Sequence, residues 1–455
     1  MISVPGEYGA GQVNGVDGAM SDEFSEPTGR YVVVLADAVH GDAAAMTSAL
    51  QSVAGVSNIL NARDFSDSAI NIEQVRDADA TLFPALGIAV VAGDPDRLTS
   101  LTAAAGEDNR IESIEPEQTL YALTQPGVLG AEYLRGYRDA AIELYEHANG
   151  NGHGNGATTA VEVAAELVDT PAFTWGLQAT RVSTSRRSGQ GVPLAILDTG
   201  FDLRHPDFVG RRITSKSFTP NQAAQDGHGH GTHCTGTSSG PLRPPGGGRR
   251  YGIAYNDNIF IGKVLSNQGS GPDEQILAGI EWALTNRCRV ISMSLGANVR
   301  EVSPAYEAVG RRALTAGCLI IAAAGNNARR SQGDFGFVNR PANSPSIMAV
   351  GAVDSQLRIA DFSARSNPVA GGQVDIVGPG VAVHSSWSTT STSPGRYRTI
   401  NGTSMATPHV SGIAALLSQA TGATGAALWG LLVRTARRLP LPSVDVGAGL
   451  VQAPQ

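Results

Sequence analysis

Apolar residues in the second half of the chain occur as short continuous runs, separated by stretches with helical spacing. The runs are residues 192–200 (VPLAILDTG), 258–266, 290–296, 318–326 and 347–354. Continuous apolar runs of this length are expected for strands buried on both faces of a sheet. Residues 272–287 and 303–317 have the apolar spacing of helices. Strands that alternate with helices predict an α/β domain with a doubly wound, mostly parallel sheet.

The first half has a different pattern, with fewer elements. It predicts strands at residues 31–36 and 87–93, helices at 42–55 and 94–106, and an extended run at 111–123. Strands and helices in this order predict a small α+β domain with its helices on one face of the sheet.

Two segments look unlike either domain. Residues 1–28 are rich in glycine, serine and acidic residues and are expected to form a disordered tail. After residue 123, an amphipathic helix is expected up to residue 148, followed by the linker NGNGHGNG at 149–156. We therefore expect four segments along the chain. They are 1–28, 29–123, 124–170 and 171–455.

Polar residues with reactive potential fall at the ends of the predicted strands. Asp198, Ser294 and Asn326 each follow an apolar run. In parallel sheets such residues collect at the carboxyl ends of the strands, where binding sites form. A serine, Ser404, lies between a glycine-marked turn and a long helical run, in the stretch NGTSMATPH.

The stretch DGHGHGTHCTG, residues 226–236, raises two interpretations of its histidines. A zinc site would need His228, His230 and His233 to converge from one glycine-rich segment, and their spacing fits no zinc signature. A serine nucleophile, in contrast, needs a histidine base whose tautomer is fixed by a buried carboxylate. The order Asp198, His230, Ser404 supplies these three groups, so the residues favour a catalytic triad over a metal site.

Four stretches around these residues resemble the subtilase family of serine peptidases. They are ILDTG ending at Gly200, HGTHCTG starting at His230, AAAGN ending at Asn326, and NGTSMATPH around Ser404. The resemblance covers about residues 171–453. It implies a subtilisin-like serine endopeptidase that works through an acyl-enzyme intermediate, with Asp198, His230 and Ser404 as its triad.

The same resemblance assigns the neighbouring residues. Asn326 would form the oxyanion hole together with the backbone N–H of Ser404. His228 precedes the family motif, and His233 lies inside it as a packing or hydrogen-bonding residue. Cys234 would be a small buried residue one helical turn after the base, and its thiol would make the enzyme sensitive to thiol reagents.

The resemblance also implies a substrate cleft in which a peptide pairs as an added β-strand between two segments. By position the two segments are Gly269, Ser270 and Gly271 on one side and Ser294, Leu295 and Gly296 on the other. Ala323 and Gly325 would be walls of the P1 pocket. Asn339 would lie near its base, which predicts a medium-sized and mildly polar pocket.

The first domain resembles the inhibitory prodomain found ahead of many subtilases. The chain would then be a self-inhibited zymogen that processes itself, with its own prodomain bound in the cleft. The tail EPEQTLYAL would place Leu120 at P4 and Leu123 at P1, so that the first cut falls at the Leu123–Thr124 bond. The flexible linker at 149–156 is the competing site, because loop tips are readily cut.

Composition limits the partners and the compartment. The net charge of -8 argues against nucleic acid, which requires a basic surface, and no apolar stretch reaches the ~18 residues of a membrane span. The resemblance implies that the chain acts on peptides or proteins, and we expect it to be a monomer. The N-terminus has no basic flank followed by an apolar core, and the three cysteines form no disulfide framework. These features favour the cytoplasm, with secretion as the alternative.

No cofactor is expected to be required, and no metal ligands are assigned. Subtilases often carry calcium in a loop after the histidine helix, but here that loop, residues 240–255, contains arginines and no carboxylate. Asp207 matches a position that the family can use for calcium, and Asp375 could contribute to a weaker site. The sequence therefore leaves calcium without a supported site.

Overall fold

The computed structural model describes residues 28–65, 78–107, 110–124, 166–245, 248–367 and 372–455. Residues 1–27 of the predicted tail, the helix predicted after Thr124 and the linker at 149–156 lie outside the described residues.

The main domain is built around a seven-stranded sheet whose strands all run parallel. In order across the sheet they are β15 (Ile376–Pro379), β14 (Met348–Val353), β13 (Leu319–Ala323), β11 (Val290–Met293), β7 (Pro193–Asp198), β9 (Asn258–Lys263) and β8 (Ile213–Ser217). The five apolar runs form the central strands, which confirms the predicted doubly wound α/β fold. The edge strands β8 and β15 were not predicted.

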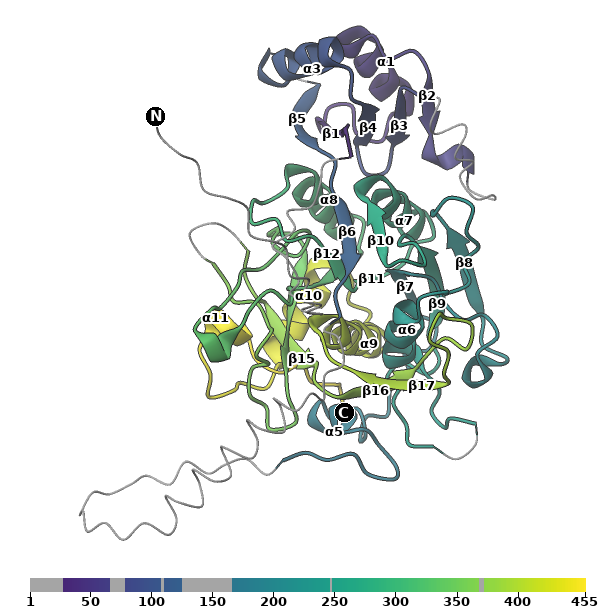
Figure 1. Cartoon of the computed structure of the whole chain (residues 1–455), viewed down its shortest axis with the longest axis vertical. Helices are drawn as coiled ribbons and strands as arrows, with labels where there is room; N and C mark the ends of the chain where they lie inside the picture. The colour runs from purple at the N-terminus through teal and green to yellow at the C-terminus, as the bar shows by residue number, and fades with distance from the viewer. Residues whose placement is uncertain (1–27, 66–77, 108–109, 125–165, 246–247, 368–371) are drawn as a thin grey trace, which may run out of the picture.

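Helices cover both faces of this sheet (Figure 1). α6 (His230–Ser239) and α9 (Thr403–Thr421) pack on one face, and α7 (Asp273–Thr285) and α8 (Pro304–Thr315) pack on the other. This domain also contains α5 (Trp175–Ala179), β16 (Val383–Ser386), β17 (Tyr397–Ile400), α10 (Gly425–Thr435) and α11 (Ser443–Val446). No single helix in the described part of the chain is long and apolar enough to cross a bilayer, although α9 and α10, bent by 107°, pass that test as a pair.

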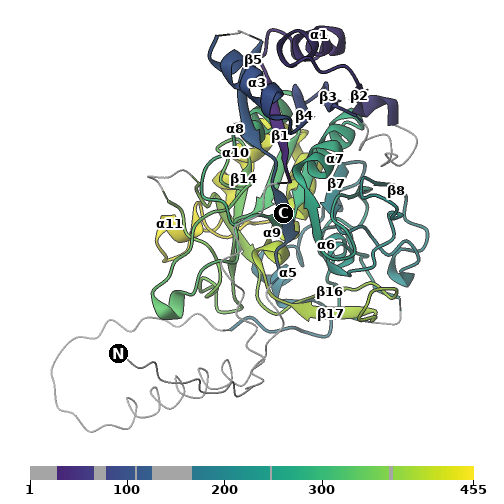
Figure 2. The ribbon, with the colours of Figure 1, turned by 45° about the horizontal axis from the view of Figure 1, so that its top comes forward.

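Residues 28–123 form a separate layer, here called the front domain, over α7 and α8 (Figure 2). Its five-stranded sheet has the order β2 (Ile59–Asn61), β3 (Ala80–Phe83), β4 (Ile88–Ala92), β1 (Arg30–Leu35) and β5 (Ile111–Pro116). The predicted helices α1 (Ala43–Ala54) and α3 (Pro95–Glu107) are present, whereas β2 and β3 were not predicted.

The alternation of side chains along β1 explains how this sheet joins the two parts of the molecule. Val33 and Leu35 belong to the core beneath α1 and α3, whereas Val32 and Val34 belong to the same core as residues of α7 and α8. Successive strand residues point to opposite faces, so one strand serves both cores. The front sheet is therefore buried on both sides.

The extended run predicted at 111–123 divides into two strands in different sheets. β5 completes the front sheet, and β6 (Thr119–Ala122) leaves it to enter the main domain (Figure 1). There it becomes the middle strand of a three-stranded sheet, between β10 (Ser270–Pro272) and β12 (Leu295–Gly296).

Candidate active site

A carboxylate and an imidazole meet at the carboxyl end of the central strand. Asp198 is the last residue of β7, and His230 is the first residue of α6. The Nδ1 atom of His230 lies 2.7 Å from Oδ1 of Asp198, and both side chains are buried. Burial lowers the pKa of His230, but the adjacent Asp198 carboxylate and Cys234 together more than offset burial and raise the pKa well above its ordinary value.

A second buried carboxylate organises the start of α6, and the sequence analysis missed it. Asp226 accepts hydrogen bonds from the backbone N–H groups of His228, Gly229 and Thr232, at 2.8–2.9 Å. Its Oδ1 also accepts from the hydroxyl of Thr199, the residue that follows Asp198. Because the N-cap Gly229 has no side chain, Asp226 takes the place of a capping residue for this helix. Its position at the beginning of the histidine-rich stretch was the available sequence signal.

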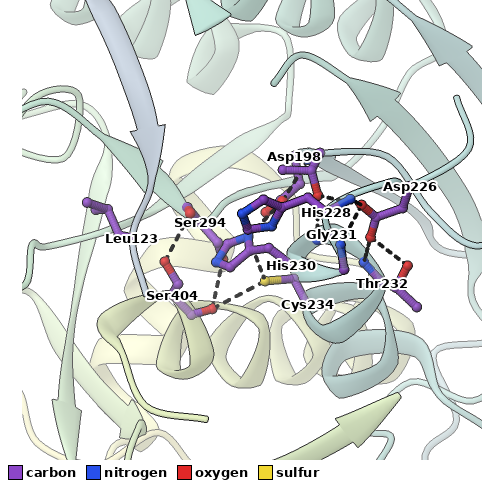
Figure 3. A network of polar contacts seen from close by, with 12 residues as sticks. Leu123, Asp198, Asp226, His228, His230, Gly231, Thr232, Cys234, Ser294 and Ser404 are labelled. Carbon is purple, nitrogen blue, oxygen red and sulfur yellow. Dashed lines mark hydrogen bonds and ion pairs between the residues drawn. The ribbon is translucent and has the colours of Figure 1, made fainter. Parts of the chain in front are cut away.

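Ser404 is the second residue of α9 and lies near His230, which belongs to α6 (Figure 3). Its hydroxyl donates to the carbonyl oxygen of Ser294 at 2.9 Å, and the hydroxyl of Ser294 donates back to the carbonyl of Ser404 at 2.9 Å. Nε2 of His230 is buried without a hydrogen-bond partner among the described residues. The serine hydroxyl would therefore have to rotate away from Ser294 in order to reach the imidazole.

Cys234 lies one turn along α6 from His230 and is buried beside it. Its Sγ atom is 3.9 Å from Nδ1 of His230 and 3.5 Å from the carbonyl oxygen of Ser404. Asp198, His230 and Cys234 are close enough together to surround a metal ion. However, burial raises the pKa of the Cys234 thiol, and a metal needs the thiolate. The Nδ1 atom of His230 is also engaged by Asp198, so this group fits zinc poorly.

The other two histidines of the stretch occupy different surroundings. The Nε2 atom of His233 lies 3.1 Å from the carbonyl oxygen of Val383, and burial together with the nearby His230 lowers the pKa of His233 to about 3. This contact agrees with the predicted hydrogen-bonding role. His228 instead lies against Gly269 of the cleft, because a Cβ atom on that glycine would be 3.1 Å from its Nε2.

The two predicted cleft segments hold a strand of the chain itself. Residues of β6 pair antiparallel with Ser270, Gly271 and Pro272 of β10 on one side and with Leu295 and Gly296 of β12 on the other. The backbone N–H of Ala122 donates to Gly269 at 2.8 Å, and that of Leu123 donates to Ser294 at 3.3 Å. The side-chain amide of Asn326 donates to the carbonyl oxygen of Leu123 at 2.8 Å.

The predicted pocket residues are all buried. Ala323 ends β13 and is buried, as are Gly325 and Asn339. The side chain of Asn339 lies against both Gly296 and Gly325. Leu120 is completely buried, whereas Leu123 is half-buried.

The candidate calcium residues have other partners. Asp207 accepts hydrogen bonds from the hydroxyls of Tyr251, at 2.5 Å, and Tyr397, at 3.1 Å. Burial raises the pKa of Asp375 to about 7, and its carboxylate accepts from the N–H of Ala349. A carboxylate paired with two tyrosines, and a second one that burial tends to neutralise, do not fit a hard cation. The two tyrosines were not identified from the sequence.

Comparison with known proteins agrees with this architecture. Residues 189–450 match the model of the subtilase family. Subtilisin E of Bacillus subtilis (strain 168) is 39% identical over 244 residues, which is 53% of this chain and 59% of that protein. Subtilisin of Bacillus pumilus is 39% identical over 244 residues, 82% of its length. Alkaline serine protease ver112 of Corniculantispora psalliotae is 36% identical over 291 residues, 60% of this chain and 68% of that protein.

The extent of these matches differs between relatives. The chain spans 59% of the length of Subtilisin E, less than two thirds, but 82% of the Bacillus pumilus subtilisin. The family match takes in the strand that carries Asp198, the helix that carries His230 and the helix that carries Ser404. The chain therefore belongs to the subtilase family.

Proposed function

We propose that this subtilase is a serine endopeptidase that is made as a zymogen inhibited by its own front domain. The observation that carries the proposal is the position of Leu123. Its backbone is paired in the cleft, and its carbonyl oxygen accepts from the amide of Asn326 at 2.8 Å. A peptide carbonyl bound this way, next to a serine and a buried Asp–His pair, is in the position of the acyl group of a substrate.

In the proposed reaction Ser404 is the nucleophile and His230 is the base. The Ser404 hydroxyl gives its proton to Nε2 of His230 as its oxygen attacks the peptide carbonyl. Asp198 holds the imidazole in the required tautomer and stabilises the imidazolium. The imidazolium then protonates the leaving amine, and water hydrolyses the acyl-enzyme by the same sequence. Asn326 stabilises the oxyanion, a contribution worth about 100- to 1,000-fold in the best-studied subtilisin.

The front domain contacts the main domain at a second place besides its tail. The turn between β3 and β4 inserts between α7 and α8, where the Glu281 carboxylate accepts from the N–H groups of Ala85 and Leu86, both at 3.1 Å. Arg312 donates to the carbonyl oxygens of Leu86, at 2.5 Å, and Leu35, at 2.8 Å. Hydrogen bonds to charged groups are each worth about 1.5–3 kcal/mol. This second attachment supports a role of the front domain as an inhibitor.

The first cut is expected between Leu123 and Thr124. The tail is already aligned in the cleft, and tethering raises its effective concentration to about the millimolar range. N-terminal sequencing during early maturation should find Thr124 as the first new N-terminus. An Ala122→Pro variant, which removes the N–H donated to Gly269, should delay this cut. A first new N-terminus within residues 149–170 would contradict the assignment.

The pH dependence follows from the ionisation of His230. Only the neutral imidazole can accept the serine proton, so kcat/KM should rise with pH as His230 loses its proton. Because Asp198 raises the pKa of His230 above its ordinary value of 6.5, the midpoint of this rise should lie above 6.5. The measurement is kcat/KM for a neutral peptide at constant ionic strength. A flat profile between about pH 5 and 8 would count against the mechanism.

A further inference from the structure

Asn339 carries a buried side-chain amide without partners. The residue is 0% exposed, and neither its Nδ2 nor its Oδ1 atom has a hydrogen-bond partner among the described residues. An unsatisfied buried polar group costs about 1–3 kcal/mol. Native proteins rarely keep such a group, and one that remains calls for an explanation. One explanation is a ligand that completes the hydrogen bonds.

The amide lies between the two segments that hold the backbone of Leu123. A Cβ atom on Gly296 would be 2.8 Å from Oδ1 of Asn339, and a Cβ atom on Gly325 would be 3.1 Å from its Nδ2. Gly296 is two residues after Ser294, which accepts from the N–H of Leu123, and Gly325 precedes Asn326, which binds its carbonyl. A side chain at Gly296 would collide with this amide, and one at Gly325 would press against it. The lack of a side chain at these two glycines makes room for the amide beside the segments that bind the backbone of Leu123.

The charged groups next to Asn339 are already paired with one another. Arg340 forms an ion pair with Asp273 of α7, which remains in the mature protein, and a second ion pair with Glu115, which leaves with the front domain. Asn339 itself is uncharged and presents one neutral donor group and one neutral acceptor. A charged substrate side chain would lose its hydration beside Asn339 without gaining a counter-charge, which is costly in free energy. A neutral amide would have a much smaller desolvation cost.

We propose that Asn339 is a specificity-determining residue, which selects substrates with a side-chain amide, glutamine above all, at P1. A P1 amide can donate to Oδ1 of Asn339 and accept from Nδ2 at the same time, so both unsatisfied atoms gain partners. Sites built to hydrogen-bond a substrate discriminate strongly against analogues that leave their polar groups unpaired. The inference rests on the proposed peptidase activity and adds the class of substrate.

The P1 residue of the chain itself is consistent with this selectivity. Leu123 has no polar side-chain atoms, so it leaves the amide of Asn339 unpaired. Tethering can compensate for a poor P1 residue in the first cut, because the effective concentration is high. Once cut, a tail ending in leucine would be displaced by a substrate that satisfies the amide. The tail would therefore leave the cleft more readily after cleavage than in the zymogen, while the contacts of Glu281 and Arg312 with the front domain remain.

The test measures kcat/KM of the mature protein for two peptide substrates. Both carry Leu-Tyr-Ala at P4–P2, taken from the chain's own tail, and a chromogenic amine as leaving group. One has glutamine at P1 and the other has methionine, which has a similar length but no amide. We expect kcat/KM to be about 5- to 150-fold higher for glutamine, the ratio that corresponds to 1–3 kcal/mol.

Two variants separate this selectivity from general effects on the fold. In Asn339→Leu the glutamine-to-methionine ratio should fall to one or below, while hydrolysis of the methionine peptide persists. Asn298→Leu makes the same change at an exposed position nearby and should leave the ratio unchanged. A wild-type ratio near one, or a high ratio that persists in Asn339→Leu, would overturn the inference. If Asn339→Leu fails to fold, the wild-type ratio of kcat/KM for the two peptides still tests the inference. Inactivity of the wild-type protein toward both peptides would overturn the proposed function instead.

Discussion

Ser404→Ala should abolish peptide hydrolysis and leave the chain at full length. The hydroxyl is the only part of this side chain that the proposed reaction uses, and its removal in subtilisin lowers kcat by about a million-fold. The fold should survive, because the lost hydroxyl makes one hydrogen bond, to the carbonyl of Ser294. The measurements are peptide hydrolysis and the mass of the purified chain after incubation.

A chemical label provides the control for this variant. Phenylmethylsulfonyl fluoride should react with Ser404 in the mature wild-type protein and with no residue in Ser404→Ala, because only an activated serine is sulfonylated. Complete processing of the Ser404→Ala chain, with outside proteases excluded, would rule out self-cleavage. A wild-type protein that is neither labelled nor active would instead be a subtilase fold without catalysis.

His230→Ala should lose activity to nearly the same extent as Ser404→Ala. Members of a triad act as a unit, so the loss of the base alone costs about as much as the loss of the whole triad, again about a million-fold in subtilisin. The structure gives the reason here, because His230 is the histidine that contacts Asp198, at 2.7 Å.

His228→Ala is the matched comparison, since the same residue type is removed two positions away. His228 borders the cleft at Gly269 and lies edge-on to the ring of His230, with 6.2 Å between the ring centroids, but no hydrogen bond from its side chain to Asp198 or Ser404 is present among the described residues. The His228→Ala variant should therefore retain substantial activity. The measurement is kcat/KM for both variants with one peptide. An inactive His228→Ala beside an active His230→Ala would mean that the base has been assigned to the wrong residue.

The positions of the reactive residues could be predicted because they depend on local pattern. Asp198 follows a continuous apolar run, and the run became the central strand β7 with Asp198 at its end. Ser404 precedes a long apolar helical stretch, and it lies in the first turn of α9. In both cases hydrophobic burial determines where the element begins or ends, and the polar residue at that point is brought to the edge of the sheet.

Contacts between distant segments could not be read from the same pattern. The five residues ITSKS of β8 contain four polar side chains, so no apolar run marked this edge strand. Asp207 was considered for calcium because it matches a position that the family can use. Its actual partners, Tyr251 and Tyr397, lie 44 and 190 positions away and could not be identified from the sequence. The open amide of Asn339 likewise depends on two glycines that only the folded chain brings together.

The three-stranded sheet at the cleft implies that a folded substrate must unfold locally before it can be cut. β10 and β12 each offer backbone groups to the strand between them, so whatever lies there must be extended over about the length of β6, Thr119–Ala122. A segment within a helix or a sheet cannot meet this demand without local unfolding, whose free energy ranges from about zero in loops to the full stability in a core. With a cleft of this kind, the local stability of a substrate segment would limit its cleavage before the identity of its side chains does. Folded domains would be spared, and loops and unfolded chains would be cut.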